Sequence, residues 1–130
     1  MSQPIRLCDD SPMAHTVLIV DDHPSFRATA RALLEAEGFD VVGEARDGRE
    51  GVELATRLHP DVVLLDVQLP DATGFEVAAE IALANAKEPR VVLVSSRDAD
   101  DYGGQIAESG ACGFVPKGEL SGAAVRALLS

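Results

Sequence analysis

Five short apolar runs divide the chain, and polar or turn-forming residues bound each of them. The longer runs are rich in β-branched residues, which favours strands that are buried on both faces. The runs lie at residues 17–20, 41–42, 62–65, 91–94 and 114–115. Strand starts taken at Val17, Val41, Val62, Val91 and Cys112 are 21 to 29 residues apart. Each interval has room for one helix and two short loops, so the pattern predicts five successive β–α units.

The segments between these runs have the periodicity of amphipathic helices. One helix is predicted between Pro24 and Gly38, because proline favours a helix start and glycine a helix end. Its apolar residues fall at helical spacing, at Phe26, Ala30, Leu33 and Leu34. A second set with this spacing follows Gly74, at Val77, Ile81 and Ala84. Residues 119–130 are long enough for one last helix.

The helix expected over residues 98–109 is weaker than the others. Gly103 and Gly104 stand side by side within it, and each glycine in a helix costs about 1 kcal/mol relative to alanine. We therefore expect this segment to be the most mobile element of the fold.

Repeated β–α units pack in one favoured way. Right-handed crossovers with helices on both faces give an open parallel sheet. We predict an α/β fold, a flavodoxin-like doubly wound (βα)5 sheet with strand order 2-1-3-4-5. In such sheets ligands bind at the carboxyl ends of the strands, so we expect the functional residues at that edge.

The length of 130 residues and the 46% hydrophobic content fit one domain with its own core. Residues 1–15 contain two prolines and show no helical or strand period. They are predicted to be a flexible N-terminal leader, to which we assign no function, and residues 16–130 the domain. Cys8 and Cys112 have neither metal-ligand spacing nor the density of a disulfide scaffold.

The net charge of −11 narrows the class of partner. Such an acidic surface repels phosphate backbones and anionic membrane faces, so direct nucleic-acid binding by this chain is not expected. No apolar run approaches the roughly 20 residues of a membrane helix, and the first residues do not form a secretion signal. We expect a cytoplasmic protein without a membrane partner.

Polar residues follow four of the five predicted strands. They are Asp21 and Asp22 after the first strand, Asp66 after the third, Ser95 after the fourth and Lys117 after the fifth. The first and third strands are neighbours at the point where the strand order reverses, so the three aspartates are expected to share a pocket. Three carboxylates need a cation to remain ionised together, and an oxygen site open to water suits Mg²⁺. A carboxylate beside a metal and an ammonium group can also be a nucleophile toward phosphorus.

Each of these residues also has a structural explanation. An aspartate pair ahead of a helix is more often a cap and a partner of the helix dipole than a metal site. Asp66 alone fits a loop start, Ser95 a turn and Lys117 a solvated charge. Their occurrence together at the ends of four predicted strands favours function.

Four segments carry a family resemblance: residues 17–24, 61–70, 94–96 and 113–117. From about Thr16 onward the sequence resembles the receiver domain of two-component response regulators. It is most similar to receivers that precede a LuxR-type DNA-binding helix-turn-helix. No such basic domain follows in this sequence, and a stand-alone receiver and the receiver of a longer regulator both stay open.

The resemblance implies a role for each polar residue at the edge. It makes Asp66 the phosphoacceptor and assigns Mg²⁺ to Asp22, Asp66 and the backbone carbonyl of Gln68, with Asp21 holding the ion through water. Lys117 and Ser95 would contact the phosphoryl group.

The resemblance also implies a switch, in which Ser95 moves onto the phosphoryl group and Phe114 turns inward behind it. Phe114 brings no hydroxyl to a position where tyrosine is also common, and Ser96 is larger than the Ala or Gly found in relatives. Gln68 and Arg97 flank the expected pocket, and we expect Gln68, Ser96 and Arg97 to tune the reaction.

The function predicted is a phosphorylation-dependent signalling switch in a two-component phosphorelay, not an enzyme with a separate substrate. The expected donor is a sensor histidine kinase or a histidine phosphotransfer protein. The expected target is a protein effector or a DNA-binding output domain, and homodimer formation is left open. The alternative is a phosphorylation-independent protein-binding module with the same fold. A phosphatase has less support, because Gln68 stands where aspartate-nucleophile phosphohydrolases need a second acid.

Overall fold

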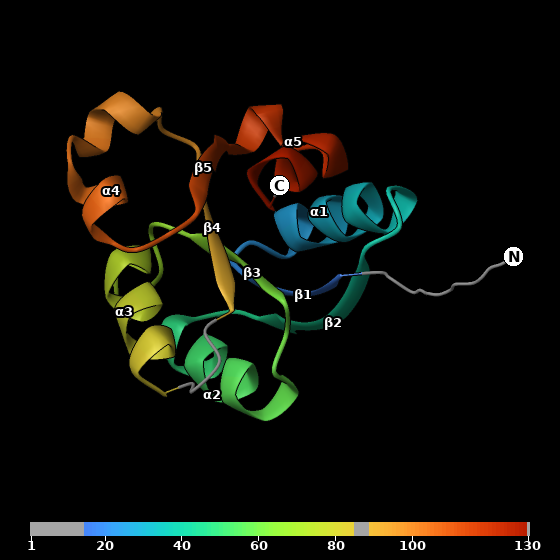
Figure 1. Ribbon diagram of the computed structural model, residues 1–130, viewed down its shortest axis with the longest axis horizontal. Coiled ribbons are helices and arrows are strands. Elements are labelled where there is room, and N and C mark those ends of the chain that lie inside the picture. Colours follow the sequence, from blue (N-terminus) through green and yellow to red (C-terminus); the bar gives the residue numbers. More distant parts are fainter. Residues whose placement is uncertain (1–14, 85–88, 130) are drawn as a thin grey trace, which may run out of the picture.

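Five parallel strands form the centre of the protein in the order β2-β1-β3-β4-β5. The computed structural model describes residues 15–84 and 89–129 (Figure 1). The strands are β1 (Thr16–Val20), β2 (Asp40–Ala45), β3 (Val62–Asp66), β4 (Arg90–Ser95) and β5 (Gly113–Pro116). The predicted α/β class and strand order are confirmed. β2 extends beyond its two-residue apolar run, because as an edge strand it pairs only with β1 and includes partly exposed residues.

Helices connect the strands on both sides of the sheet. They are α1 (Pro24–Ala36), α2 (Gly48–Leu58), α3 (Gly74–Ala84), α4 (Gln105–Glu108) and α5 (Gly122–Leu129), with 3-10 turns η1 (Ala99–Tyr102) and η2 (Lys117–Glu119). The starts expected at Pro24 and Gly74 agree with α1 and α3. His59 ends α2 with φ 48°, and the last helix is shorter than the segment allotted to it.

The weak helix predicted over residues 98–109 is interrupted in the structure. Gly103 separates η1 from the four-residue α4 with φ 58° and ψ −129°, a conformation that is natural only for glycine. The break explains why no continuous helix forms here. The greater mobility expected of this segment stays a prediction.

Two apolar layers cover the sheet. α1 and α5 lie on one face, and α2 and α3 lie on the other (Figure 1). Side chains of β1 alternate between them: Ile19 packs in the layer of α1 and α5, and Leu18 in the layer of α2 and α3. Strands that are buried on both faces read as continuous apolar runs, which is the pattern seen in the sequence.

The sheet register sets the positions of the polar residues at its carboxyl edge. Val20 pairs with Leu65 across β1 and β3, so Asp21 and Asp66 leave neighbouring strands at the same level. Of the predicted leader, only His15 is described; its carbonyl accepts a hydrogen bond from Asp40 N at 2.9 Å. Residues 1–14 lie outside the described part. Within residues 15–84 and 89–129, no helix has the length and apolar character to cross a membrane.

Candidate functional site

Three aspartates meet at the carboxyl edge of β1 and β3. Asp21, Asp22 and Asp66, called the acidic cluster below, lie with His23 so that one ligand atom from each falls within 4.8 Å of the others. Asp21 and Asp66 are buried, whereas Asp22 and His23 border solvent. The structure therefore brings together the three aspartates that the sequence predicted to meet at this edge.

Two of the predicted residues end strands instead of following them. Asp66 pairs with Val94, and Ser95 pairs with Pro116. Their backbones continue the parallel ladder, and this pairing fixes where each side chain leaves the sheet. The difference of one position leaves both at the predicted edge.

Lys117 brings a positive charge to the acidic cluster. Its Nζ lies 2.7 Å from Oδ2 of Asp21 and 3.3 Å from Oδ2 of Asp66. The same nitrogen lies 4.6 Å from the ring centroid of Phe26, on the face of α1, a cation–π contact. Lys117, at the start of η2, thus connects the end of β5 to Asp21 and Asp66.

Burial and neighbouring charges shift the pKa values of Asp66 and Lys117. Burial, followed by the negative charge of Asp21, raises the pKa of Asp66 to about 6, and the charge of Lys117 opposes this rise. Burial alone lowers the pKa of Lys117, but the hydrogen bond to Asp21 and the charges of Asp66 and Asp21 together raise it above its usual value. Lys117 therefore stays protonated, and the carboxylates retain excess negative charge.

The β1–α1 loop holds Asp21 in place. His23 N donates a hydrogen bond to Oδ1 of Asp21 at 2.7 Å, and Arg27 donates to the Asp21 carbonyl at 2.6 Å. The guanidinium of Arg27 also pairs with Glu44 of β2 at 3.1 Å. Asp21 is thus anchored through its side chain and its backbone.

The loop after β3 turns closely around Asp66. Gln68 N donates to Oδ1 of Asp66 at 3.3 Å, and Gly74 N donates to the Val67 carbonyl at 2.6 Å. A Cβ atom at Gly74 would lie 2.5 Å from the Asp66 carbonyl oxygen, so α3 can begin this close only with glycine. The backbone of Gln68 therefore lies beside Asp66, while its side chain is exposed.

Ser95 does not join the acidic cluster through a hydrogen bond recorded for the described residues. Its buried Oγ instead lies 2.5 Å from the hydroxyl of Tyr102 and accepts a hydrogen bond from Arg97 N at 3.1 Å. The ring of Tyr102 packs against Phe114, with centroids 5.9 Å apart. Ser96 and Arg97 are exposed at the start of the following loop.

The comparison with protein families decides the class. Residues 17–128 match the model of the response regulator receiver domain. The chain belongs to the response regulator receiver family. It is a receiver domain of two-component response regulators, as the sequence motifs predicted.

Individual relatives agree with this assignment. The receiver is 37% identical to the virulence transcription regulator BvgA of Bordetella pertussis over 82% of this chain and 51% of that protein. It is 38% identical to the response regulator GacA of Pseudomonas aeruginosa over 78% of this chain and 48% of that protein. The chain spans about half the length of the curated relatives it matches.

A solved structure supports the fold. The signal receiver domain of the response regulator NarL from Mycobacterium tuberculosis superposes with a TM-score of 0.78 at 35% identity. The match covers 92% of this chain and 99% of that one. The receiver therefore shares its fold with a solved response regulator receiver domain.

Sequence reasoning missed two residues of the receiver site. The sequence analysis gives no role to His23, yet its Nδ1 lies 3.0 Å from Oδ1 of Asp21 and 3.1 Å from Oδ1 of Asp22. Its position directly after the aspartate pair was an available signal. Tyr102 had none beyond being the only tyrosine of the chain, because a seven-residue separation from Ser95 predicts a contact only once the intervening turn is known.

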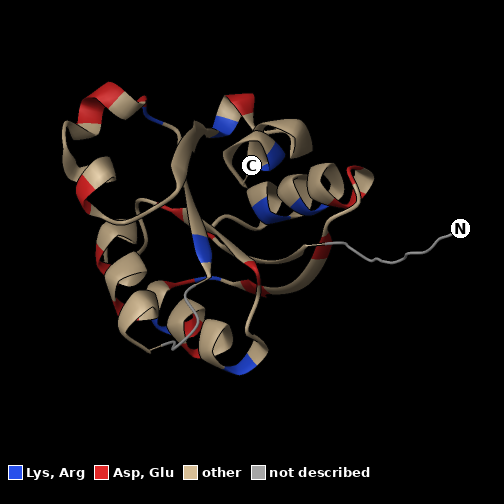
Figure 2. Cartoon of the chain, viewed as in Figure 1, with Lys and Arg blue, Asp and Glu red and all other residues tan. Residues whose placement is uncertain are grey.

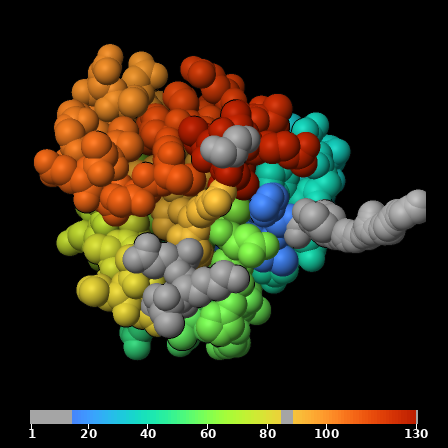
Figure 3. All heavy atoms as spheres, in the orientation of Figure 1, coloured from blue at the N-terminus to red at the C-terminus, as the bar shows by residue number. Residues whose placement is uncertain are grey.

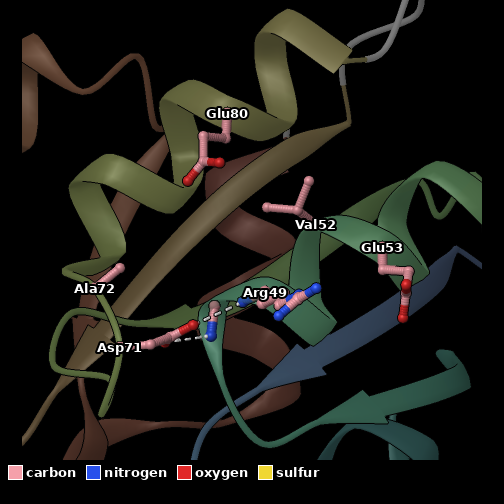
Figure 4. A pocket seen from close by; sticks show the side chains of 7 residues that line it. Arg49, Val52, Glu53, Asp71, Ala72 and Glu80 are labelled. Carbon is pink, nitrogen blue, oxygen red and sulfur yellow. Dashed lines mark hydrogen bonds between the residues drawn. The ribbon is translucent and has the colours of Figure 1, made fainter.

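A hollow with a volume of about 370 Å³ lies between α2 and α3, next to the loop that precedes α3 (Figure 4). Its lining includes Arg49, Glu53 and Glu80 and none of the acidic cluster. Asp71 closes one side, where its carboxylate accepts hydrogen bonds from Gly48 N at 2.8 Å and Arg49 N at 3.0 Å. The hollow is separate from the receiver's acidic cluster.

Proposed function

We propose that Asp66 is the phosphoacceptor of this receiver and that its phosphorylation switches the protein between two states. One observation carries the proposal: Asp66 is a buried carboxylate 3.3 Å from the ammonium group of Lys117, inside a cluster of two further aspartates. With a pKa of about 6, Asp66 is mostly ionised at neutral pH and able to act as a nucleophile.

Phosphoryl transfer requires that the reacting groups are positioned and that the charge on the transferred phosphoryl group is neutralised. A carboxylate oxygen of Asp66 forms a bond to phosphorus as the phosphorus–nitrogen bond of a phosphohistidine breaks, and the imidazole keeps the electron pair. Lys117 neutralises charge on the transferred group, and no general base is needed. The acyl phosphate is later hydrolysed by water, so the receiver assists its own turnover without a separate substrate.

The acidic cluster fits Mg²⁺. Oδ2 of Asp21 and Oδ1 of Asp22 are buried. Within residues 15–84 and 89–129, the polar contacts recorded for these two oxygens are those with Lys117 at 2.7 Å and with His23 at 3.1 Å. Hard carboxylate oxygens are the ligands that Mg²⁺ prefers. Asp22, Asp66 and the Gln68 carbonyl would hold the ion directly, and Asp21, already bound to Lys117, through water. Bound there, Mg²⁺ supplies positive charge to the phosphoryl oxygens.

The switch is proposed to run through β4 and β5. A phosphoryl group adds charge and acceptor oxygens that draw the Ser95 hydroxyl toward Asp66. The space that Ser95 leaves favours an inward rotamer of Phe114, which shifts the population between two packings. The exposed residues Gln68, Ser96 and Arg97 border this path, and we expect them to set the lifetime of the phosphorylated form.

The partners follow from the reaction and from the relatives. The donor is a sensor histidine kinase or a histidine phosphotransfer protein. The output is contact with a protein effector or with a DNA-binding domain, which the curated relatives, named as transcription regulators, suggest. Homodimer formation and the cytoplasmic location expected from the sequence stay predictions.

Intact-mass spectrometry after incubation with acetyl phosphate tests the proposal. Wild type is expected to gain one alkali-labile phosphoryl group in Mg²⁺, and none in EDTA. Asp66→Asn should gain none in either buffer, and Asp61→Asn, at the start of β3, is the control and should behave as wild type. Labelling of Asp66→Asn would refute the assignment. No labelling of wild type by any donor would favour the phosphorylation-independent binding module.

A further inference from the structure

The η1–α4 segment, residues 99–108, is fastened to the rest of the receiver at few points. Three of the four residues of η1 are exposed, and only Tyr102 is partly buried. Tyr102 and Ile106 of α4 both pack against the apolar layer that lies between the sheet and the helices α2 and α3. The segment lies between α3 and the C-terminal part of the chain (Figure 3). Tyr102 is therefore the main attachment of η1 to the body of the protein.

The ring of Tyr102 packs against side chains of α3 and β5. It lies edge-on to Phe75 of α3, with centroids 5.6 Å apart, and is tilted against Phe114 of β5, with centroids 5.9 Å apart. Phe75 directly follows Gly74, whose backbone lies against Asp66. The ring is thus packed beside the acceptor loop and beside the aromatic residue of the switch.

The Tyr102 hydroxyl forms a hydrogen bond with the Ser95 hydroxyl. The two oxygens lie 2.5 Å apart, and Arg97 N also donates to the Ser95 oxygen. Ser95 has a single hydroxyl on one rotatable bond, with one proton and two acceptor sites. Both partners lie beyond the end of β4, whereas Asp66 lies on neighbouring β3, so a turn of Ser95 toward Asp66 costs the hydrogen bond to Tyr102.

We propose that Tyr102 is a positioning residue of the switch, whose hydroxyl competes with the phosphoryl group on Asp66 for Ser95. The inference rests on the proposed function of Asp66. When Ser95 turns to the phosphoryl group, the half-buried Tyr102 hydroxyl loses its partner, and η1 loses its main polar attachment. Phe114 has no hydroxyl group, and in this receiver the aromatic hydroxyl near the switch comes from Tyr102 of η1. Phosphorylation then changes the surface of the η1–α4 segment.

The chain offers a direct probe, because Tyr102 is its only tyrosine and it has no tryptophan. Wild type is titrated with beryllofluoride, a phosphoryl analogue, in Mg²⁺, while tyrosine emission is recorded and binding is measured by calorimetry. Emission is expected to change with the same midpoint as the heat of binding. In Ser95→Ala, binding of the analogue should leave the emission unchanged.

A double-mutant cycle separates positioning from general packing. Tyr102→Phe keeps the ring and removes the competing hydroxyl, so it should tighten beryllofluoride binding by roughly 2- to 10-fold, the range of one net hydrogen bond. In the Ser95→Ala background the same change should have no effect. Thr29→Val, which removes a hydroxyl from the exposed face of α1, is the control and should bind as wild type.

The outcomes are distinct. Unchanged or weaker binding by Tyr102→Phe, or equal tightening in both backgrounds, overturns the inference while the role of Asp66 stands. Constant tyrosine emission during binding also overturns it. No beryllofluoride binding by wild type, or equal binding by Asp66→Asn, overturns the proposed function and this inference with it.

Discussion

The two ends of the proposed switch are built differently. At the acidic cluster, Asp21 is held by its own loop, by Arg27 and by Lys117, and Gly74 presses the next helix against Asp66. The η1–α4 segment instead depends on Tyr102, Ile106 and short-range caps such as the paired bonds between Asp98 and Asp101. The proposed phosphoacceptor thus lies at strand ends with many anchoring contacts, and the proposed response lies in a segment with few attachments.

The two regions also differ in how their charged side chains are paired. The acidic cluster has a basic partner, and α1 carries Arg27 and Arg31 on the side that faces β2, where both pair with Glu44 (Figure 2). The η1 turn carries Asp100 and Asp101 on its exposed surface, and no ion pair to either is recorded within the described residues. Within the described residues, ion pairs therefore do not tie the acidic side chains of η1 to the rest of the receiver.

The largest effect is expected at the rigid end, from Lys117→Ala. Loss of the ammonium removes the charge that faces the transferred group, so the rate of labelling by acetyl phosphate should fall roughly 10²-fold or more. Arg57→Ala, an exposed cation of α2, is the control and should label as wild type. A Lys117→Ala rate within threefold of wild type would show that the ammonium is dispensable.

Alanine substitutions at two glycines test the difference between the two regions through the free energy of unfolding. Gly74→Ala places a methyl group 2.5 Å from a backbone oxygen and should lower the free energy of unfolding by about 2 kcal/mol. Gly104→Ala, at φ −82° with only the Glu108 carboxylate nearby, should raise it by about 0.5 kcal/mol. Urea denaturation measures both. Equal destabilisation by the two changes would contradict the distinction between the rigid and the loose region.

The raised pKa of Asp66 predicts a pH dependence in Mg²⁺-free buffer. Between pH 3.8 and about 6 the folded protein binds more protons at Asp66 than the unfolded chain, so stability contributed by this residue falls as pH rises through that window. Above pH 6, Asp66→Asn should be more stable than wild type by roughly 1–3 kcal/mol. The difference should vanish near pH 3.5 and shrink in Mg²⁺. Thermal unfolding at several pH values measures it, and a difference independent of pH would refute the cause given.

The smallest effect is expected at the α1–β2 pairs. The hydrogen bond from Arg31 outweighs burial and lowers the pKa of Glu44. Its contribution to stability is therefore present above the usual pKa of 4.5 and is lost as pH falls through the lower, folded value. Glu44→Gln should cost less than 1 kcal/mol at pH 7, because the pairs are partly exposed. Glu53→Gln on α2 is the control, and an equal loss there would remove the argument.

The sequence was most informative where structure is repetitive. Doubly buried strands need continuous apolar runs, so β1, β3 and β4 could be predicted from the hydrophobic pattern along the chain, and the predicted topology then brought Asp21, Asp66 and Lys117 to one edge. The contact of Ser95 with Tyr102 could not be predicted in this way. It depends on how the backbone turns over residues 96–101, between the two side chains, which is a property of the folded loop and leaves no period in the sequence.

The carboxylate of Asp71 has a consequence for how the protein is made. It completes the first turn of α2 by accepting the amide hydrogens of Gly48 and Arg49, 23 and 22 residues earlier in the chain. During synthesis those amides must wait for a residue that the ribosome has not yet added. The second β–α unit therefore reaches its final hydrogen bonding only after the third strand and the loop that carries Asp71 have emerged.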